Sequence, residues 1–335
     1  MKTVLMLSCP NDAHILPVQT AVQRMGGSVL FCNIADFPEK VQLSATLSRE
    51  QTGWDGTLSF QQQAVVWRDI QSIWWRRPKR YQPERYAPEI GKLLSQEAYY
   101  GFLGLLLGSP DDQQPFWVSR PYAIRVAEFK ASQLALAQRL GLRVPKTLIT
   151  NEPGAVQVFY EECEGKVICK PVWKGNLTPG EQATPEQPRI IYTNHVQYEH
   201  LALLDGVRAT AHCFQQYIEK QLEVRVVVIG RQMFAVTIHS QASENTRLDW
   251  RRCYADLQYG VHVLPDDLKQ RLFQLVSLFG LQYASMDLIL TPEGEYVFVE
   301  VNPNGQFYWL EPPTGLPMAQ AMAHLLVSPE EYALC

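Results

Sequence analysis

The segment 287–302 constrains the fold of this 335-residue chain more than any other part of it. Residues 287–290 and 296–302 are two mostly apolar runs, and the Glu293-Gly294 pair between them is typical of a tight turn. If Thr291 pairs with Tyr296, then Asp287 lies opposite Glu300 on the neighbouring strand. The segment therefore predicts an antiparallel β-hairpin.

Three polar side chains interrupt this apolar hairpin. Glu300 and Asn302 share one face of their strand, because alternate residues of a strand point the same way, and Asp287 faces them. Two carboxylates and an amide oxygen are hard ligands suited to Mg²⁺, with nucleotide phosphates completing the coordination shell. Ordinary surface carboxylates are the alternative. The apolar surroundings favour a half-buried magnesium site.

Two lysines stand in apolar segments. Lys130 lies in a predicted helix, and Lys170 ends the apolar run Val167-Ile168-Cys169. A lysine inside a buried strand needs an anionic partner, and phosphate is one such partner. Each lysine taken alone would more often reach solvent, so the interpretation depends on their combination with the hairpin.

A third element is the segment Gln215-Gln216-Tyr217-Ile218, followed by Glu223 and Arg225. The edge of a strand can bind adenine through its backbone N–H and C=O groups, and a carboxylate that follows it can accept the ribose hydroxyls. Arg225 shares a face with Glu223 and could stabilise a phosphoryl group in transfer. The alternative is a surface Glu–Arg pair.

The pattern of apolar residues predicts a mixed α/β chain whose first third is a small α/β unit beginning with a strand buried on both faces. Buried strands are expected at 3–7, 29–32 and 70–75, helices at 16–25 and 89–107, and a hairpin at 41–47 and 54–60. A loop is expected at 108–121 and a helix at 126–140. Further strands are expected at 166–171, 213–218, 223–229 and 232–238, with a mobile segment at 175–188 and a helix at 268–279.

Composition limits the class of protein. The net charge of −4 argues against a general nucleic-acid binder, which would carry a basic surplus. Seven cysteines without CxxC spacing predict neither a zinc site nor a disulfide framework. We expect no membrane partner and a cytoplasmic location, because no targeting segment or long apolar stretch is visible.

Together these motifs resemble the ATP-grasp superfamily over residues 122–326. Within it the chain is similar to the ribosomal-peptide maturases of the microviridin-ligase (graspetide) type. The segments behind the narrower resemblance are 73–77, 144–151, 238–241, 249–252 and 300–306. Between Lys170 and His195 the sequence is short and Pro-rich, which departs from the family's mobile hairpin, where the precursor's leader is recognised.

The resemblance implies an α+β ATP-grasp fold with a pre-ATP-grasp α/β domain at 1–117. A central ATP-grasp subdomain at 118–205 and a C-terminal subdomain with the magnesium site at 206–335 would follow. It implies ATP and Mg²⁺ as cofactors. Lys130, Lys170, residues 215–218 and Glu223 would then bind ATP, and Arg225 and Lys170 would be catalytic.

The implied activity is the ATP-dependent cross-linking of a ribosomal precursor peptide, made of a leader and a core. Asp or Glu side chains would be activated as acyl phosphates and joined to a hydroxyl as an ester or to an amine as an amide. One alternative is an ATP-grasp carboxylate–amine ligase for a small molecule or a protein tail. Another is a non-catalytic nucleotide-binding partner protein.

Five further residues are candidates for contact with the substrate, and a homodimer is a possible assembly. Arg76 and Arg77 follow two tryptophans and could hold substrate carboxylates, or could stack on those rings by cation–π packing. Asp249 and Arg251 lie in a predicted loop, where recognition residues often occur. Asn304 lies in the maturase-like segment 300–306.

Overall fold

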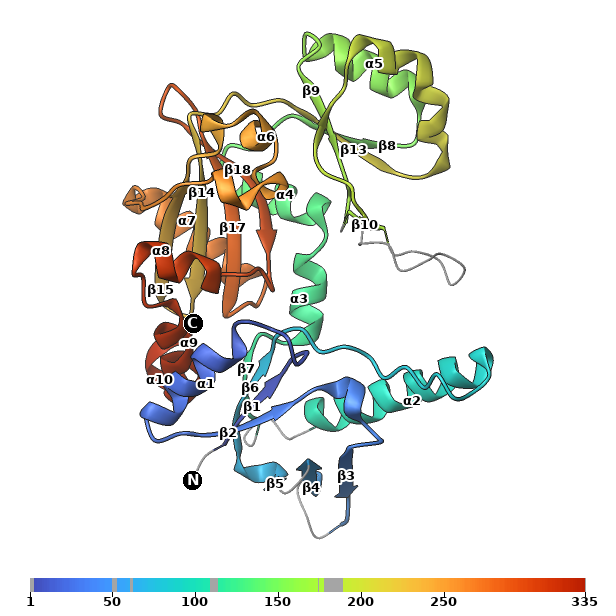
Figure 1. Cartoon of the computed structure of the whole chain (residues 1–335), viewed down its shortest axis with the longest axis vertical. Helices are drawn as coiled ribbons and strands as arrows, with labels where there is room; N and C mark the ends of the chain where they lie inside the picture. Colours follow the sequence, from blue (N-terminus) through green and yellow to red (C-terminus); the bar gives the residue numbers. More distant parts are fainter. Residues whose placement is uncertain are drawn as a thin grey trace.

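The computed structural model describes residues 3–49, 53–60, 63–108, 114–173, 175–177 and 189–334. Figure 1 shows three units: an N-terminal unit, a small central unit and a C-terminal unit built on a five-stranded sheet. The central unit projects from the other two, and α3 (Pro121–Ala127) runs between the N-terminal and C-terminal units.

The N-terminal unit contains a parallel sheet in the order β2-β1-β6-β7. Its strands are Ser28–Cys32 (β2), Thr3–Leu7 (β1), Ile70–Trp75 (β6) and Phe116–Val118 (β7). All five residues of β1 are buried, as expected for an apolar run at the centre of a parallel sheet. Helices α1 (Ile15–Arg24) and α2 (Pro88–Leu107) belong to this unit.

The predicted hairpin is confirmed as β3 (Val41–Thr46) and β4 (Asp55–Phe60), which pair antiparallel. Two strands differ from the prediction. A third strand, β5 (Gln63–Val66), extends the hairpin, and β7 lies where a loop was expected at 108–121. A strand of three residues is too short to show alternation, and β7 exists because β6 offers it an edge.

The single helix predicted at 126–140 is wrong. The chain forms α3 and then α4 (Lys130–Arg139), with Phe129 in an extended conformation between them. The side chain of Gln133 donates a hydrogen bond to the carbonyl of Ala127 across this break, at 2.6 Å. Lys130 is therefore the first residue of a helix rather than a residue in its middle.

The central unit is an antiparallel sheet in the order β12-β9-β13-β8. These strands are Asn194–His195 (β12), Val167–Lys170 (β9), His212–Gln216 (β13) and Thr147–Thr150 (β8). Helix α5 (Pro153–Glu162) and the 3₁₀ segment Tyr198–Ala209 pack with it around a separate small core. Most of the predicted mobile segment 175–188 lies outside the described residues; its described part, β10 (Asn176–Leu177), pairs with β11 (Arg189–Ile190).

The C-terminal sheet has the order β16-β15-β14-β17-β18 and is antiparallel throughout. Its strands are Tyr259–Val261 (β16), Gln232–Ile238 (β15), Leu222–Ile229 (β14), Tyr283–Leu290 (β17) and Tyr296–Asn302 (β18). Helix α7 (Asp266–Leu278) buries leucines in the larger core. Helix α9 (Met318–Val327) packs against α1 of the N-terminal unit. The short helices α6, α8 and α10 span Glu244–Arg247, Glu311–Thr314 and Pro329–Tyr332.

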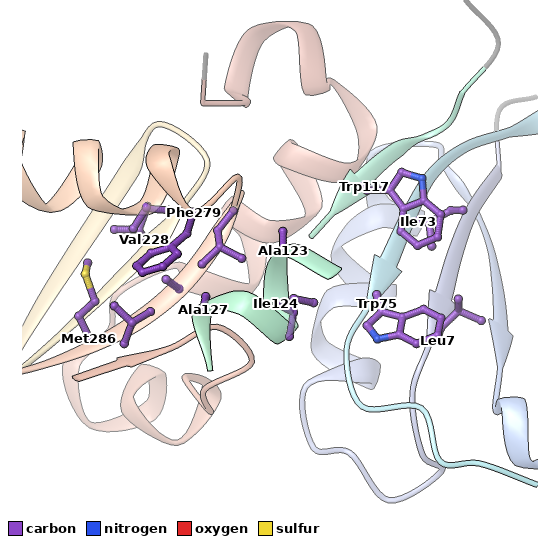
Figure 2. Close-up of a cluster of buried hydrophobic side chains, with 14 of the residues drawn as sticks. Leu7, Ile73, Trp75, Trp117, Ala123, Ile124, Ala127, Val228, Phe279 and Met286 are labelled. Atoms are coloured by element: carbon purple, nitrogen blue, oxygen red, sulfur yellow. The ribbon is translucent and has the colours of Figure 1, made fainter. Parts of the chain in front are cut away.

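Two hydrophobic cores contain residues of both the N-terminal and C-terminal units, and the larger is shown in Figure 2. Figure 2 shows Ala123, Ile124 and Ala127 of α3 between Trp75 of the N-terminal sheet and Met286 of the C-terminal sheet. Both predicted domain boundaries remain predictions: the one at 117/118 falls within β7, and the one at 205/206 falls within the 3₁₀ segment. Among the described residues, no helix combines the length and apolarity needed to cross a bilayer.

Candidate functional site

A cavity of about 250 Å³ lies between the central sheet and the C-terminal sheet. Its lining contains most of the residues that the sequence analysis singled out for chemistry. They are Lys130, Lys170, Gln215, Gln216, Tyr217, Ile218, Glu223, Asp249, Arg251, Asp287, Glu300 and Asn302. These residues come from segments more than 170 positions apart, so the tertiary fold gathers them in one place.

The hairpin of β17 and β18 places Asp287 opposite Glu300, as predicted, but its register differs from the prediction. Tyr296 pairs with Leu290 rather than with Thr291. An irregularity beside Asp287 leaves Val299 without a partner, and this extra residue restores the pairing of Asp287 with Glu300. The predicted pairing of Thr291 with Tyr296 is therefore wrong, although the pairing at the site is confirmed.

Asp287, Glu300 and Asn302 converge at the cavity. The side-chain amide of Asn302 donates to Asp287 Oδ2 and to Glu300 Oε1, each at 3.1 Å. Because the amide nitrogen makes both bonds, the carbonyl oxygen of Asn302 remains as an acceptor. The part of the chain that the structure describes contains no group of three or more His, Cys, Asp or Glu side chains that could hold a metal ion. The candidate metal ligands at this site are instead two carboxylates and one amide oxygen.

Cations surround both carboxylates. Arg225 Nη1 lies 2.7 and 2.8 Å from the two oxygens of Asp287, and Lys130 Nζ donates to Glu300 Oε2. Burial raises the pKa of Asp287 despite the nearby Arg225 charge. Burial also raises the pKa of Glu300, but the charges of Lys130 and Lys170 outweigh it, and the net pKa lies well below the usual range. Both carboxylates thus lie in a site of concentrated positive charge.

Lys170 ends β9 and is only 8% exposed. Its ammonium has no hydrogen-bond or ion-pair partner in the described part of the chain. Burial, and then the like charge of Lys130, lower the pKa of Lys170 to about 8. A buried ammonium beside a cavity is stabilised by an anionic ligand in that cavity.

The segment 215–218 lies along the cavity where β13 ends. The N–H groups of Gln216 and Tyr217 bond to the carbonyls of Lys146 and Lys166 at 2.9 and 2.8 Å. The N–H of Ile218 has no backbone acceptor among the described residues. Gln215 is buried and donates to Thr147 Oγ1 at 2.8 Å. This segment can therefore offer an unpaired donor to a planar ring.

Glu223 and Arg225 are buried, so the alternative of a surface Glu–Arg pair is wrong. Oε1 of Glu223 accepts bonds from Lys220 Nζ at 2.7 Å and from Ser240 Oγ at 3.0 Å, while burial raises the pKa of Glu223. Arg225 pairs with Asp287 on β17, because the β14–β17 register places the two residues opposite each other. Lys220 lines the cavity but was not singled out from the sequence.

Asp249 and Arg251 form a two-point ion pair at the cavity wall. Arg251 Nε and Nη2 lie 2.8 and 2.7 Å from the two oxygens of Asp249. Asp249 is 5% exposed and also accepts the backbone N–H of Thr193 at 3.2 Å. The carboxylate is thus occupied within the protein, and Arg251 retains further donors that can face the cavity.

Arg76, Arg77 and Asn304 lie together but away from the cavity lining. Arg76 is fully buried, which contradicts its predicted contact with substrate carboxylates. Its guanidinium donates to the backbone carbonyl of Asn304, as does Arg77 at 3.1 Å. Among the described residues neither arginine stacks on Trp74 or Trp75, so the cation–π alternative does not hold there either.

Sequence reasoning missed Gln133, which is 2% exposed. Its amide accepts the N–H of Val301 at 2.9 Å and donates to the carbonyl of Val301 at 2.8 Å. Val301 stands between Glu300 and Asn302, so Gln133 holds the strand that carries both. A buried glutamine gives no local signal when its partner is 168 residues away.

Comparison with known families covers nearly the whole chain. Residues 3–120 match the MvdD pre-ATP-grasp domain, and residues 127–326 match the RimK-like ATP-grasp domain. No match was found among curated protein sequences.

Three solved structures resemble the chain over 98% of its length. The macrocyclase MdnC of Microcystis aeruginosa MRC, bound with the precursor peptide MdnA, is 28% identical, with a TM-score of 0.83 and 100% of its own chain covered. A RiPP-associated ATP-grasp ligase of Chryseobacterium gregarium, in complex with ADP and a leader and core peptide, is 26% identical, with a TM-score of 0.88 and 97% covered. The macrocyclase MdnB of Microcystis aeruginosa MRC is 32% identical, with a TM-score of 0.75 and 100% covered.

The similarity to the ATP-grasp superfamily expected from the sequence is thereby confirmed, as is the fold of a pre-ATP-grasp domain followed by an ATP-grasp domain. The family match of residues 127–326 covers more than half of the chain, and the cavity lies within it. The chain belongs to the RimK-like ATP-grasp family and is an ATP-dependent ligase that uses ATP with Mg²⁺.

Proposed function

We propose that this ligase cross-links a ribosomal precursor peptide through ester or amide bonds. A substrate Asp or Glu side chain would take the γ-phosphoryl group of ATP, and a hydroxyl or amine of the same peptide would displace the phosphate. The observation that carries this proposal is the resemblance, over 98% of the chain, to a RiPP-associated ligase solved with ADP and with a leader and core peptide.

The residues at the cavity suit nucleotide and metal. Asp287, Glu300 and Asn302 offer hard oxygen ligands to Mg²⁺, which would neutralise charge between the phosphates when bound. Lys130 and Lys170 would contact phosphate oxygens, which would supply the anionic partner that buried Lys170 lacks. The donor set therefore fits the metal and the phosphates.

The adenosine part of ATP would lie along the segment 215–218. The free N–H of Ile218 can donate to the adenine ring, with Gln215, Gln216 and Tyr217 lining the same wall. Glu223 Oε2 accepts no hydrogen bond from the described residues, while Oε1 is held by Lys220 and Ser240. This free oxygen is available to the ribose hydroxyls.

Arg225 and Lys170 are the proposed catalytic residues. Both side chains are buried and cationic, and they approach the carboxylate cluster from two different sheets. Fixed positive groups in a site shielded from water stabilise the charge that builds up on a transferring phosphoryl group. Arg251 would hold the substrate carboxylate, with Asp249 fixing its guanidinium. Asn304 and Arg77 lie farther out, and we propose them only as contacts for distal parts of the peptide.

A peptide reaction monitored by mass spectrometry tests the proposal. Each ring closure should remove one water, about 18 Da, because the attacking hydroxyl or amine expels phosphate together with one carboxyl oxygen, while the carboxyl and the nucleophile each give up one hydrogen. Asn302→Ala should lose at least about 100-fold in rate, because it removes a metal ligand. The matched control Asn151→Ala, an exposed position away from the cavity, should retain the wild-type rate.

Other outcomes identify the alternatives. If the peptide keeps its starting mass while a small carboxylic acid is consumed with release of phosphate, a small-molecule ligase replaces the peptide maturase. If ATP binds but no candidate acid releases phosphate, the protein is a nucleotide-binding partner without activity. A core peptide without its leader should react more slowly, since remote contacts position the reacting groups.

A homodimer formed through α2 in the cytoplasm completes the proposal. Ile90, Leu93 and Tyr100 are 46%, 56% and 70% exposed along this helix, which extends away from the rest of the molecule (Figure 1). These three side chains lie toward one side of α2, with the exposed Glu97 between Leu93 and Tyr100, and exposed apolar side chains on one helix face can be buried by a second copy. We expect sedimentation equilibrium to give a dimer and Leu93→Asp to give a monomer; a wild-type monomer would contradict the assembly.

The described cysteines are all unpaired, which suits a reducing compartment.

A further inference from the structure

The loop 303–308 follows Asn302 and lies directly against Arg225. The carbonyl of Gln306 accepts a hydrogen bond from Arg225 Nη2 at 3.3 Å. A Cβ placed on Gly305 would lie 2.8 Å from that same Nη2 and 2.5 Å from the Cβ of Ser285, so only glycine fits. Tyr283 donates its hydroxyl to the carbonyl of Gly305 at 2.6 Å. Asp287 holds Nη1 of Arg225, and this loop fixes the side on which Nη2 lies.

The N-terminal unit holds the same loop from the other side. Nε2 of His14 accepts the backbone N–H groups of Phe307 and Tyr308, at 2.9 and 3.1 Å. Arg76 donates to the carbonyl of Asn304. These hydrogen bonds join residues more than 200 positions apart in the sequence, and the side chains that make them are buried, since His14 is 3% exposed and Arg76 is fully buried.

Asp12, His14 and Arg76 form a buried cluster that sets the state of the His14 ring. Asp12 Oδ1 lies 2.7 Å from His14 Nδ1, and Asp12 Oδ2 lies 3.4 Å from Arg76 Nε. Backbone N–H groups can only donate, so Nε2 must be the acceptor, and the neutral ring carries its proton on Nδ1 toward Asp12. The contact of 3.5 Å between Arg76 Nη2 and His14 Nδ1 is then not a hydrogen bond. Burial lowers the pKa of His14, which favours this neutral ring.

We infer that the Asp12–His14–Arg76 cluster positions catalytic Arg225 through the loop 303–308. The inference rests on the proposed function, because it requires Arg225 to act on the group in transfer. Asp12, His14 and Arg76 reach Arg225 only through this loop, so they are positioning residues, whereas Arg225 itself contacts Asp287, which lines the cavity. The N-terminal unit thereby controls the rate of the reaction and leaves the affinity for ATP unchanged.

Two substitutions of His14 and one of Asp12 test this inference. His14→Leu removes the acceptor for both N–H groups, and we expect kcat to fall about 10- to 100-fold with the KM for ATP unchanged, as for a small misplacement of a catalytic group. His14→Gln can present its side-chain oxygen near the former Nε2 position, so most of kcat should return. Asp12→Asn keeps its size but no longer fixes the proton on Nδ1, and it should lower kcat in the same way.

A double variant and a stability control separate positioning from general damage. In an Arg225→Lys background, adding His14→Leu should lower the residual rate by less than twofold, because the group through which His14 acts is already lost. Val22→Ala removes buried methyl groups from α1 without touching the loop, and it should lower the melting temperature but not kcat. A folded His14→Leu protein with wild-type kcat would overturn the inference.

Hydrogen exchange gives a readout that does not depend on the substrate. In His14→Leu, the amides of Phe307 and Tyr308 should exchange faster than in the wild type, and His14→Gln should restore their protection. Unchanged exchange would overturn the inference whatever the substrate. If instead the wild type leaves the peptide unmodified but uses a small acid, the proposed function fails, and kcat on that acid still tests His14.

Discussion

At the scale of single residues, Lys170 shows how burial prepares a group for its ligand. Its ammonium is buried beside Lys130, and the pKa of Lys170 falls to about 8. Between this pH and the ordinary lysine pKa of 10.5, the unfolded chain binds more protons than the folded chain. The free energy of unfolding therefore rises with pH across that window. At neutral pH the buried, protonated Lys170 lowers the free energy of unfolding, and a bound phosphate would stabilise its charge.

This gives a prediction for nucleotide binding. Above pH 8 the free protein loses the Lys170 proton, so the affinity for MgADP should fall by up to about tenfold per pH unit. Lys170→Arg should bind more weakly at neutral pH but should show no such fall, because arginine stays charged. Calorimetric titrations from pH 7 to pH 10 measure both. Equal slopes for wild type and variant would show that Lys170 does not contact the phosphates.

At the scale of elements, the strand β18 is held in place by the helix α4. Gln133 makes one bond to Ala127 at the end of α3 and two bonds to Val301, so it fixes both the helix break and the strand. The break makes Lys130 the first residue of α4, where the helix dipole disfavours a cation, and the ion pair with Glu300 offsets this. The start of α4 and the end of β18 are therefore held together at the carboxylate cluster by the bonds of Gln133 to Val301 and by the Lys130–Glu300 ion pair.

Gln133→Leu should lower the free energy of unfolding by about 2–4 kcal/mol, because it leaves buried N–H and C=O groups without partners. It should also slow ligation, since Glu300 and Asn302 flank Val301. Urea denaturation gives the first quantity, and phosphate release gives the second. Gln138→Leu, on an exposed position of the same helix, is the control and should change neither. A Gln133→Leu protein as stable as the control would contradict this account.

At the scale of the whole molecule, the N-terminal and C-terminal units share their hydrophobic cores, whereas the central unit has its own. Ile124 of α3 lies in the larger shared core (Figure 2), and Val156 lies in the small central core. A unit with a separate core can unfold separately. The nucleotide cavity lies between these two bodies, so it joins parts of the molecule that differ in stability.

Scanning calorimetry should therefore resolve two transitions. Ile124→Ala should destabilise the larger body by about 2–5 kcal/mol, the usual cost of truncating a buried isoleucine, and leave the smaller transition in place. Val156→Ala should shift only the smaller transition. A single transition that both variants shift equally would show one cooperative unit. MgADP should bring the two transitions together, because it binds both bodies.

Local pattern determined the elements and the chemistry of this protein. The β1 strand, the β3–β4 hairpin and the spacing of Glu300 and Asn302 were predicted because periodicity and turn residues act over a few positions. The groups chosen for chemistry all lie in described segments, and most line one cavity. Their roles in binding and catalysis remain predictions.

Only the tertiary structure decided how distant segments meet. The helix predicted at 126–140 is interrupted at Phe129, and β7 pairs with the edge of β6. In the β17–β18 hairpin, Val299 is an extra unpaired residue that brings Glu300 opposite Asp287. In the folded chain Arg76 is buried, where it contacts the carboxylate of Asp12 and the backbone carbonyl of Asn304. The helix break, β7 and the contacts of Arg76 depend on partners outside the local segment, and hydrogen bonds and burial at such distances leave no period in the sequence.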